Sequence, residues 1–447
     1  MNTGETQHLD SPVLAAVLAD ENFWPSEPHS LEETGLTEPF VESLIFKHLL
    51  VSGTASGRGM ADRVCLPFGV LEAFFSSLRA RQLVVHAGPA AFNDYYYTLT
   101  EAGRQHAQGH AKLCAYTGPA PVPLMDYVIS VEAQAIRAEP VRRDKFELAF
   151  QDISVNSDLF SSLGPAVNSG AGMFLYGAPG NGKSTLARRI TMCFGQAIWL
   201  PHAIIEDGQI VKVFDASYHS EVKAPENDFL KRTAHDRRWI KVRRPTVVVG
   251  GELTMDALEI RHDPRSNVSE APLQMKSNCG CLLIDDFGRQ RVAPAELLNR
   301  WIVPLESHHD FLSLSTGKKI QVPFEQLILF STNLEPADLV DEAFLRRIPY
   351  KIEICDPDLD EFHYLFELHA LSMGIECRRD DVEHLIAKHY RPHDRAMRRC
   401  HPRDLLQQVR NYCVYNDLPI EVRPEHFDRV VASYFTTVLK SEPALKS

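Results

Sequence analysis

The sequence predicts an α/β fold, and three observations support this class. Short apolar runs at residues 173–176, 281–284 and 327–330 have the length and composition of buried strands. The first run leads directly into a glycine-rich loop and then into a helical pattern over residues 185–190. Beyond Cys355 the pattern is largely helical, which indicates a helical region attached to the α/β domain.

Composition and charge restrict the class of protein. The 447 residues are 44% hydrophobic and 24% charged, which is ordinary for globular protein and allows roughly three domains. The net charge of −12 argues against a nucleic-acid backbone as the main partner, since domains that bind one are usually basic. The N-terminus lacks a basic start followed by an apolar run, and no apolar stretch approaches the roughly 20 residues that span a bilayer. We expect a cytoplasmic protein without a membrane span.

The nine cysteines are scattered, and the closest pair is Cys279 and Cys281. No second Cys or His pair lies at a distance that would complete a metal site. We interpret them as buried thiols in a reducing compartment.

Residues 1–36 are predicted to be a flexible acidic tail. They contain seven acidic residues and no Lys or Arg, and three prolines interrupt them. Two interpretations of this segment are equally supported: a solvated leader without a partner, and an arm that binds a partner.

Residues 37–112 predict one small domain. Three helices, the last over 68–81, precede two extended runs at 83–86 and 95–99, with turn residues between these runs. Three helices and a β-hairpin resemble a winged helix-turn-helix.

This winged-helix-like domain could bind DNA or protein. The end of the third helix that would face base edges, residues 67–71, is apolar. Residues 37–112 hold seven basic and six acidic side chains, whereas DNA binding needs a strongly cationic surface. We favour a protein-docking domain and keep DNA binding as the alternative.

Residues 113–145 are predicted to be a Pro-rich linker, because the prolines within 117–123 favour an extended, semi-rigid chain. The charged group Arg142-Arg143-Asp144-Lys145 near its end is interpreted as a solvated face.

The strongest signal in the chain is a match to GxxxxGK[ST]. The matching segment is Gly177-Ala178-Pro179-Gly180-Asn181-Gly182-Lys183-Ser184, and the helical pattern begins at Thr185. Glycines let such a loop turn its backbone N–H groups toward phosphates, and the following helix adds its positive end. Lys183 would place a charge at the β- and γ-phosphates, and Ser184 would offer its hydroxyl oxygen to Mg²⁺. These residues, Thr185 included, are the candidate ATP-binding residues.

Two adjacent carboxylates, Asp285 and Asp286, follow the apolar run at 281–284. Paired acids after four buried residues are costly unless a cation lies near them. We expect Asp285 to lie near the metal and Asp286 to orient or deprotonate the attacking water.

Asn333 follows the third apolar run. Alone, an Asn after a strand is usually a turn residue. After the two preceding motifs, it becomes a candidate for holding the water and the γ-phosphate.

Together these motifs resemble those of the AAA+ superfamily, with Gly177–Ser184 as Walker A, residues 282–286 as Walker B and Asn333 as sensor 1. The resemblance covers residues 146–440. It implies a P-loop parallel sheet flanked by helices in an AAA+ nucleotide-binding domain at 146–355 and a helical lid at 356–447.

The resemblance also implies two arginines that stabilise phosphate charge. Residues 341–348 resemble the family's arginine-finger stretch, in which Arg347, or else Arg346, would complete the site of a neighbouring subunit. Residues 401–406 resemble a sensor 2 element, from which Arg403 would reach the γ-phosphate.

Two features depart from a minimal AAA+ module. Asp286 stands where the family normally has Glu, so either the water lies closer or hydrolysis is slow. The segment between Cys193 and Cys281 is long; of its extended runs, including 210–214 and 246–249, one is expected to be a core strand and the others an inserted hairpin.

A further hairpin is predicted over residues 310–322, just before sensor 1. It is similar to the pre-sensor 1 hairpin of the MoxR-like and helicase-like branches. Lys318 and Lys319 at its turn are candidates for partner contact, although a solvated turn is favoured.

The resemblance implies a Mg²⁺-dependent ATPase, expected to be a homo-oligomeric, hexameric ring that remodels or assembles protein partners through residues 1–112. One alternative is a DNA-linked ATPase, an initiator or transcription regulator that uses the winged helix. Another is a slow-hydrolysing switch, in which bound ATP organises an assembly.

Overall fold

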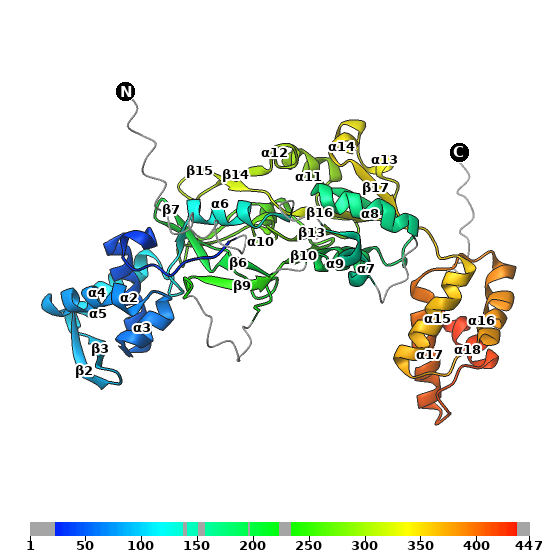
Figure 1. The fold of residues 1–447 in the computed structure, drawn as a ribbon, viewed down its shortest axis with the longest axis horizontal. Coiled ribbons are helices and arrows are strands. Elements are labelled where there is room, and N and C mark those ends of the chain that lie inside the picture. The colour runs from blue at the N-terminus through cyan, green and yellow to red at the C-terminus, as the bar shows by residue number, and fades with distance from the viewer. Residues whose placement is uncertain (1–22, 137–140, 151–156, 195–196, 223–233, 436–447) are drawn as a thin grey trace, which may run out of the picture.

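The computed structural model describes residues 23–136, 141–150, 157–194, 197–222 and 234–435. The molecule is elongated. An N-terminal region, a central α/β region and a C-terminal helical bundle follow one another along its long axis (Figure 1). Among the described residues, no helix combines the length and apolar character needed to cross a membrane.

A sheet of five parallel strands forms the centre of the molecule. The strand order is β10-β13-β16-β5-β17. The strands are β5 (Met173–Tyr176), β10 (Thr246–Val249), β13 (Cys281–Ile284), β16 (Leu327–Thr332) and β17 (Tyr350–Glu353). β13 and β16 are buried along their whole length, as expected for inner strands covered on both faces. The predicted core strands are confirmed, including the one at 246–249.

Alternate residues of these strands point into two separate cores. Met173 and Leu175 pack in one core, whereas Phe174 between them packs in the other. The helices that close the first core are α7 (Arg143–Ala149), α8 (Ser157–Ser169) and α9 (Lys183–Met192). Those that close the second are α11 (Pro294–Arg300), α12 (Ile302–Ser307), α13 (Pro336–Leu339) and α14 (Glu342–Arg347). The predicted class, a parallel sheet flanked by helices, is confirmed.

A second, β-rich unit adjoins this sheet and is built mainly from the long segment between Cys193 and Cys281. One sheet has the order β11-β12-β8-β7-β4, and β6 pairs with β9 separately. Besides β10 of the central sheet, the strands between these cysteines are β6 (Ala197–Pro201), β7 (Ala203–Glu206), β8 (Gln209–Lys212), β9 (Trp239–Arg243), β11 (Arg261–Asp263) and β12 (Val268–Glu270), and the short helices are η3 (Met255–Leu258) and α10 (Leu273–Lys276). The antiparallel pair β7–β8 is the predicted inserted hairpin.

The hairpin predicted over residues 310–322 is also present. It consists of β14 (His309–Ser313) and β15 (Lys319–Pro323), which pair antiparallel. Its inward side chains Leu312 and Ile320 pack in the core of the β-rich unit.

Part of the predicted linker is a folded element of the β-rich unit. β4 (Val122–Pro123) pairs with β7, and α6 (Leu124–Ala133) buries Tyr127 and Val131 in the core. The linker prediction is wrong for these residues, because the apolar side chains at 124, 127 and 131 share one helical face that packs against the unit. The prolines mark an edge strand and a helix start, not an extended tether.

The described part of the N-terminal region holds three α-helices and a small antiparallel sheet ordered β1-β3-β2, followed by a fourth α-helix. Its elements are η1 (Glu32–Thr34), α2 (Glu38–Ser52), β1 (Thr54–Ser56), α3 (Gly57–Val64), α4 (Phe68–Ala80), β2 (Val84–Ala90), β3 (Asp94–Leu99) and α5 (Glu101–Leu113). Asp94 accepts hydrogen bonds from the backbone N–H groups of Gly57 (3.2 Å) and Arg58 (2.8 Å), so the β2–β3 hairpin is tied to the first turn of α3.

Residues 23–36 are folded against the rest of the protein. Phe23 packs on Trp239 with ring centroids 5.2 Å apart. Buried Arg238 donates a hydrogen bond to the carbonyl of Thr34 at 2.7 Å. The prediction of a flexible tail is wrong for these residues, because aromatic burial and a buried cation outweigh the acidic composition. The remainder of that prediction, residues 1–22, lies outside the described residues.

The C-terminal region is a helical bundle with a core of its own, as the pattern beyond Cys355 predicts. Its elements are α15 (Leu359–Met373), α16 (Arg379–Leu385), the π-helical turn η4 (Ile386–Tyr390), η5 (Arg391–His393), α17 (Cys400–Tyr415) and α18 (Pro424–Tyr434). We call this bundle the lid.

Candidate functional site

The glycine-rich loop joins β5 to α9. Gly177, Gly180 and Gly182 adopt φ values of +131°, +85° and +81°, which favour glycine. A Cβ on Gly177 would lie 2.6 Å from the carbonyl oxygen of Ile354, so no other residue fits there. The backbone N–H groups of Gly180, Gly182 and Lys183 donate to no acceptor among the described residues. The loop is therefore a cradle of free donors in front of the positive end of a helix, which suits an anion.

Lys183 is buried at the centre of this loop. Its ammonium donates to the carbonyls of Gly177 (2.9 Å) and Ala178 (3.0 Å) and to Oδ1 of Asn333 (2.7 Å). Burial lowers the pKa of Lys183, while the carboxylates of Asp285 and Asp286 oppose that shift. The first and third motifs therefore meet through a direct hydrogen bond.

The second motif meets the first at Ser184, whose hydroxyl donates to Oδ2 of Asp285 at 2.6 Å. Nδ2 of Asn333 lies 3.5 Å from Oδ1 of Asp286. These contacts follow from the topology, because β5, β16 and β13 are neighbours and parallel strands end at one edge of the sheet. Asp286 has φ +51°, a left-handed conformation that costs a non-glycine residue ~1 kcal/mol.

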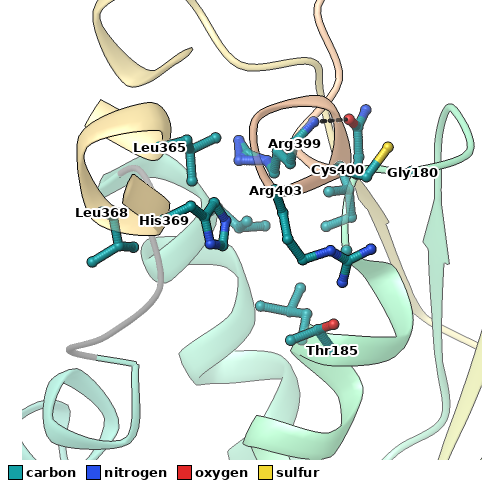
Figure 2. Close-up of a pocket in the computed structure, with 13 residues that line it drawn as sticks. Gly180, Thr185, Leu365, Leu368, His369, Arg399, Cys400 and Arg403 are labelled. Atoms are coloured by element: carbon teal, nitrogen blue, oxygen red, sulfur yellow. Dashed lines mark hydrogen bonds between the residues drawn. The ribbon is translucent and has the colours of Figure 1, made fainter. Parts of the chain in front are cut away.

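A cavity of about 320 Å³ lies between the loop and the lid. Leu159, Ile354, Leu365 and Leu368 give it an apolar wall, and Arg403 lies on its cationic side. Figure 2 shows the Arg403 side chain pointing from α17 toward Thr185 at the start of α9. An apolar wall beside a phosphate cradle matches the two ends of a nucleotide.

Two polar lid residues line the same cavity. Arg403 pairs with the adjacent Asp404 at 2.8 Å, so its guanidinium is held at the cavity by its neighbour. His369 also points into the cavity (Figure 2). Burial lowers the pKa of His369, and the positive charge of Arg403 lowers it further. Both influences favour the neutral form of the imidazole.

The other predicted arginines lie away from this site. Arg347 ends α14, where its Nε donates to Glu306 at 2.7 Å and one terminal nitrogen donates to the carbonyl of Ala343 at 3.1 Å. Arg346 is exposed beside it. In the part of the chain that the structure describes, neither arginine contacts the Lys183–Asp285 site.

The lysines of the β14–β15 turn and the CxC pair have ordinary structural surroundings. Lys318 forms a 2.7 Å ion pair with Glu206 of the β-rich unit, and Lys319 is exposed beside it.

Cys279 and Cys281 are buried, and burial raises the pKa of each thiol to about 12. The interpretation of Cys279 and Cys281 as buried thiols is confirmed.

The oxygen atoms at this edge fit a magnesium ion. The Ser184 hydroxyl and the Asp285 carboxylate are in contact, and hard oxygen ligands of this kind, completed by phosphates and water, are what Mg²⁺ prefers. Among the described residues there is no cluster of three or more His, Cys, Asp or Glu side chains that would hold a metal ion alone. Ser184 and Asp285 are the candidate ligands of such an ion.

Asn181 was predicted only as an ATP-binding residue, and the sequence carries no signal for the contacts that join the loop to the lid. The side chain of Asn181 is 2% exposed and turns away from the loop to Asp356, which accepts from its Nδ2 at 2.6 Å. Arg398 also pairs with Asp356, and Arg399 forms a double hydrogen bond with Glu361. No spacing signal identifies these partners, because they come from segments more than 170 residues away from the loop.

Comparisons with known proteins give limited matches. A family profile described as "Domain of unknown function (DUF8689)" matches residues 358–433, which form most of the lid. No curated protein matches the chain.

Two solved structures illustrate the structural matches. A mutant of RuvB from Thermotoga maritima is 14% identical with a TM-score of 0.39, over 62% of this chain and 70% of that one. NtrX from Brucella abortus is 13% identical with a TM-score of 0.39, over 65% of this chain and 58% of that one. Similarity at this level carries no argument about this chain. The fold is therefore assigned from the strand order of its own sheet, and the candidate site from the contacts among its own residues.

Proposed function

We propose that this protein is an ATPase of the AAA+ type that hydrolyses ATP with Mg²⁺. The observation that carries the proposal is the meeting of three motifs at one edge of the sheet. Lys183 contacts Asn333, and Ser184 contacts Asp285, directly in front of the free N–H groups of the loop. A buried cation, two acids and an amide around an anion cradle are the parts that phosphoryl transfer to water requires.

Each side chain has a proposed role in the attack of water on the γ-phosphate. Lys183 and Arg403 stabilise negative charge on the phosphates, and Asn333 and Asp286 orient the water. Ser184 and Asp285 would hold Mg²⁺, which supplies charge neutralisation at the β- and γ-phosphates when bound. Asp286 is one methylene shorter than Glu, so it would accept a proton only from a water that lies closer to the strand end; otherwise hydrolysis would be slow.

The direct test replaces the two charged groups separately. Lys183→Ala should abolish nucleotide binding, measured by calorimetry with ATP, because the central phosphate contact is lost. Asp286→Asn should keep binding and lose phosphate release, because only the water is affected. Tight ATP binding by Lys183→Ala would contradict the proposal, as would full turnover by Asp286→Asn.

A homo-oligomer, expected to be a hexamer, is proposed from the position of Arg347. This arginine stands at the end of α14 and contacts Glu306 instead of the nucleotide site of its own chain. An arginine finger that acts on a neighbouring subunit needs such a place. Arg347 would exchange Glu306 for the γ-phosphate bound by the adjacent chain.

The N-terminal region is proposed as the docking domain for a protein partner that the ATPase remodels or assembles. We propose domains at residues 37–112 (winged-helix-like), 146–355 (nucleotide-binding) and 356–447 (lid). The β2–β3 hairpin of the first carries Tyr95 and Tyr96, both partly exposed, and Phe92, which is 84% exposed. Exposed aromatic side chains on a domain with seven basic and six acidic residues favour a protein partner over a phosphate backbone.

A binding assay separates this docking role from the DNA-linked alternative. Labelled duplex DNA at 50 mM salt should show no shift with the full chain, because electrostatic attraction is strongest at low salt and is weak here. A shift that weakens steeply with added salt would favour the DNA-linked ATPase.

A further inference from the structure

The loop and the lid are joined by one buried carboxamide. Asn181 lies between two glycines of the loop, yet its side chain is 2% exposed and makes both of its hydrogen bonds to the lid side. Its Nδ2 donates to Oδ1 of Asp356 at 2.6 Å, and its Oδ1 accepts from the backbone N–H of Arg399 at 3.2 Å. Asp356 lies just before α15, and Arg399 lies just before α17. A single side chain thus holds the starts of two lid helices.

Two further contacts reinforce this connection. The backbone N–H of Cys400 donates to the carbonyl of Gly180 at 2.9 Å. A Cβ on Gly180 would lie 2.6 Å from Sγ of Cys400, so the close approach of lid and loop depends on glycine here. Arg398 pairs with the same carboxylate that accepts from Asn181, so Asp356 joins the loop to the segment that leads into α17.

Arg398, which pairs with Asp356, lies beside the loop that is proposed to bind the phosphates. The Cβ of Arg398 is 3.8 Å from a Cβ built on Gly180, so this arginine stands next to the loop. Its charge is one of the influences that lower the pKa of Lys183, after burial. The loop is therefore in direct contact with Asp356 and with the first turn of α17, and Arg398 is paired to that same Asp356.

We propose that Asn181 and Asp356 form a latch through which the phosphate loop positions the lid, so that nucleotide binding and lid closure stabilise each other. This inference rests on the proposed function, because it concerns the same nucleotide. The two effects are reciprocal: a lid that cannot latch weakens nucleotide binding, and a nucleotide on the loop steadies the lid. Asn181 and Asp356 are positioning residues that act through the loop and through Arg398.

Asn181→Asp breaks the latch with the smallest change of shape. It would set two carboxylates at hydrogen-bond distance, where like charges repel. Because a hydrogen bond to a charged group is lost and replaced by repulsion, we expect nucleotide affinity to fall about tenfold or more. The kcat of the bound enzyme should change less, because the groups that act on the water are untouched.

A second substitution should repair the first. Asp356→Asn, added to Asn181→Asp, places an amide N–H donor at position 356 opposite a carboxylate acceptor at position 181. The hydrogen bond can then form again in the reverse direction. Nucleotide affinity should rise above that of Asn181→Asp by about threefold or more, which exceeds the usual error of additivity. Recovery should stay incomplete, because Asp356→Asn also removes the ion pair with Arg398. Asp358→Asn, added to Asn181→Asp, is the matched control. Asp358 caps α15 by accepting from the N–H of Glu361, a role that Asn fills equally well, so it should repair nothing.

The experiment measures ADP and ATPγS binding by calorimetry for the four proteins, together with hydrogen exchange of residues 178–182 and 354–359 without nucleotide. The latch predicts faster exchange in both segments for Asn181→Asp and slower exchange again with Asp356→Asn. Affinity unchanged by Asn181→Asp, or repair by Asp358→Asn as complete as by Asp356→Asn, would overturn it. If wild type bound no nucleotide, the proposed function would fail, and the exchange of the nucleotide-free proteins would still test the latch.

Discussion

Removing the side chain of Asn333 tests whether the third motif acts on the reaction or only completes the fold. Its Oδ1 accepts from the Lys183 ammonium at 2.7 Å, and its Nδ2 lies 3.5 Å from Asp286. Asn333→Ala removes one of three acceptors of Lys183 and leaves the carbonyls of Gly177 and Ala178 in place. Lys183 therefore stays positioned for the phosphates, while nothing orients the water from this side.

The size of the effect follows from the kind of bond lost. A hydrogen bond that involves a charged group contributes about 1.5–3 kcal/mol, which corresponds to roughly a 10- to 150-fold decrease in kcat. The Kd for ATP should stay within about threefold of wild type, because hydrogen bonds from the loop to the phosphates remain.

Phosphate release at saturating ATP and calorimetric titration measure the two quantities separately. Leu334→Ala is the matched control, because this neighbouring side chain is 45% exposed and apolar. An Asn333→Ala protein with wild-type kcat would refute the catalytic role of the amide. A hundredfold loss of affinity with unchanged kcat would show instead that Asn333 serves binding.

Other perturbations test the remaining parts of the account. Arg347→Ala should bind ATP normally and lose turnover, and mixing it with Asp285→Asn should recover part of the activity if sites are shared between subunits; no recovery at any mixing ratio would argue against an arginine supplied in trans. Asp236→Ala should lower the free energy of unfolding in urea by about 3–5 kcal/mol, because it leaves Arg238, whose side chain is 3% exposed, without its 2.7 Å carboxylate partner; a loss below 1 kcal/mol would mean that water reaches the cation. Burial lowers the pKa of His401 to about 4, so between pH 6.5 and pH 4 the unfolded chain binds a proton that the folded lid does not, and stability falls as the pH falls. His401→Gln should therefore show a shallower loss of thermal stability over this pH range than wild type, and an unchanged slope would contradict the assignment.

The candidate site was predictable from sequence because the residues that form its loop are close together in the chain. The glycine positions, Lys183 and Ser184 lie within eight residues of chain, and the loop needs only the strand before it and the helix after it. The proximity of Asp285 and Asn333 to the loop was also predictable, because each follows an apolar run and parallel strands bring such ends to one edge.

The contacts with the lid and the N-terminal region could not be predicted in this way. The burial of Asn181 against Asp356 depends on how the lid rests on the loop, which no pattern within either segment encodes. The folding of residues 23–36 and 122–133 depends on the surface of the β-rich unit, where Trp239 and β7 receive them. Acidic and Pro-rich composition favoured tails and linkers there, and tertiary burial outweighed that preference.

The position of bound metal and triphosphate tests the central claim most directly. A crystal structure with Mn²⁺ and ATPγS, using the anomalous signal of manganese, locates the ion without assumptions about the protein. We predict a manganese peak beside Ser184 and Asp285, with the triphosphate along the loop from Gly177 to Lys183. A nucleotide bound elsewhere, or a metal peak away from these two side chains, would contradict the account.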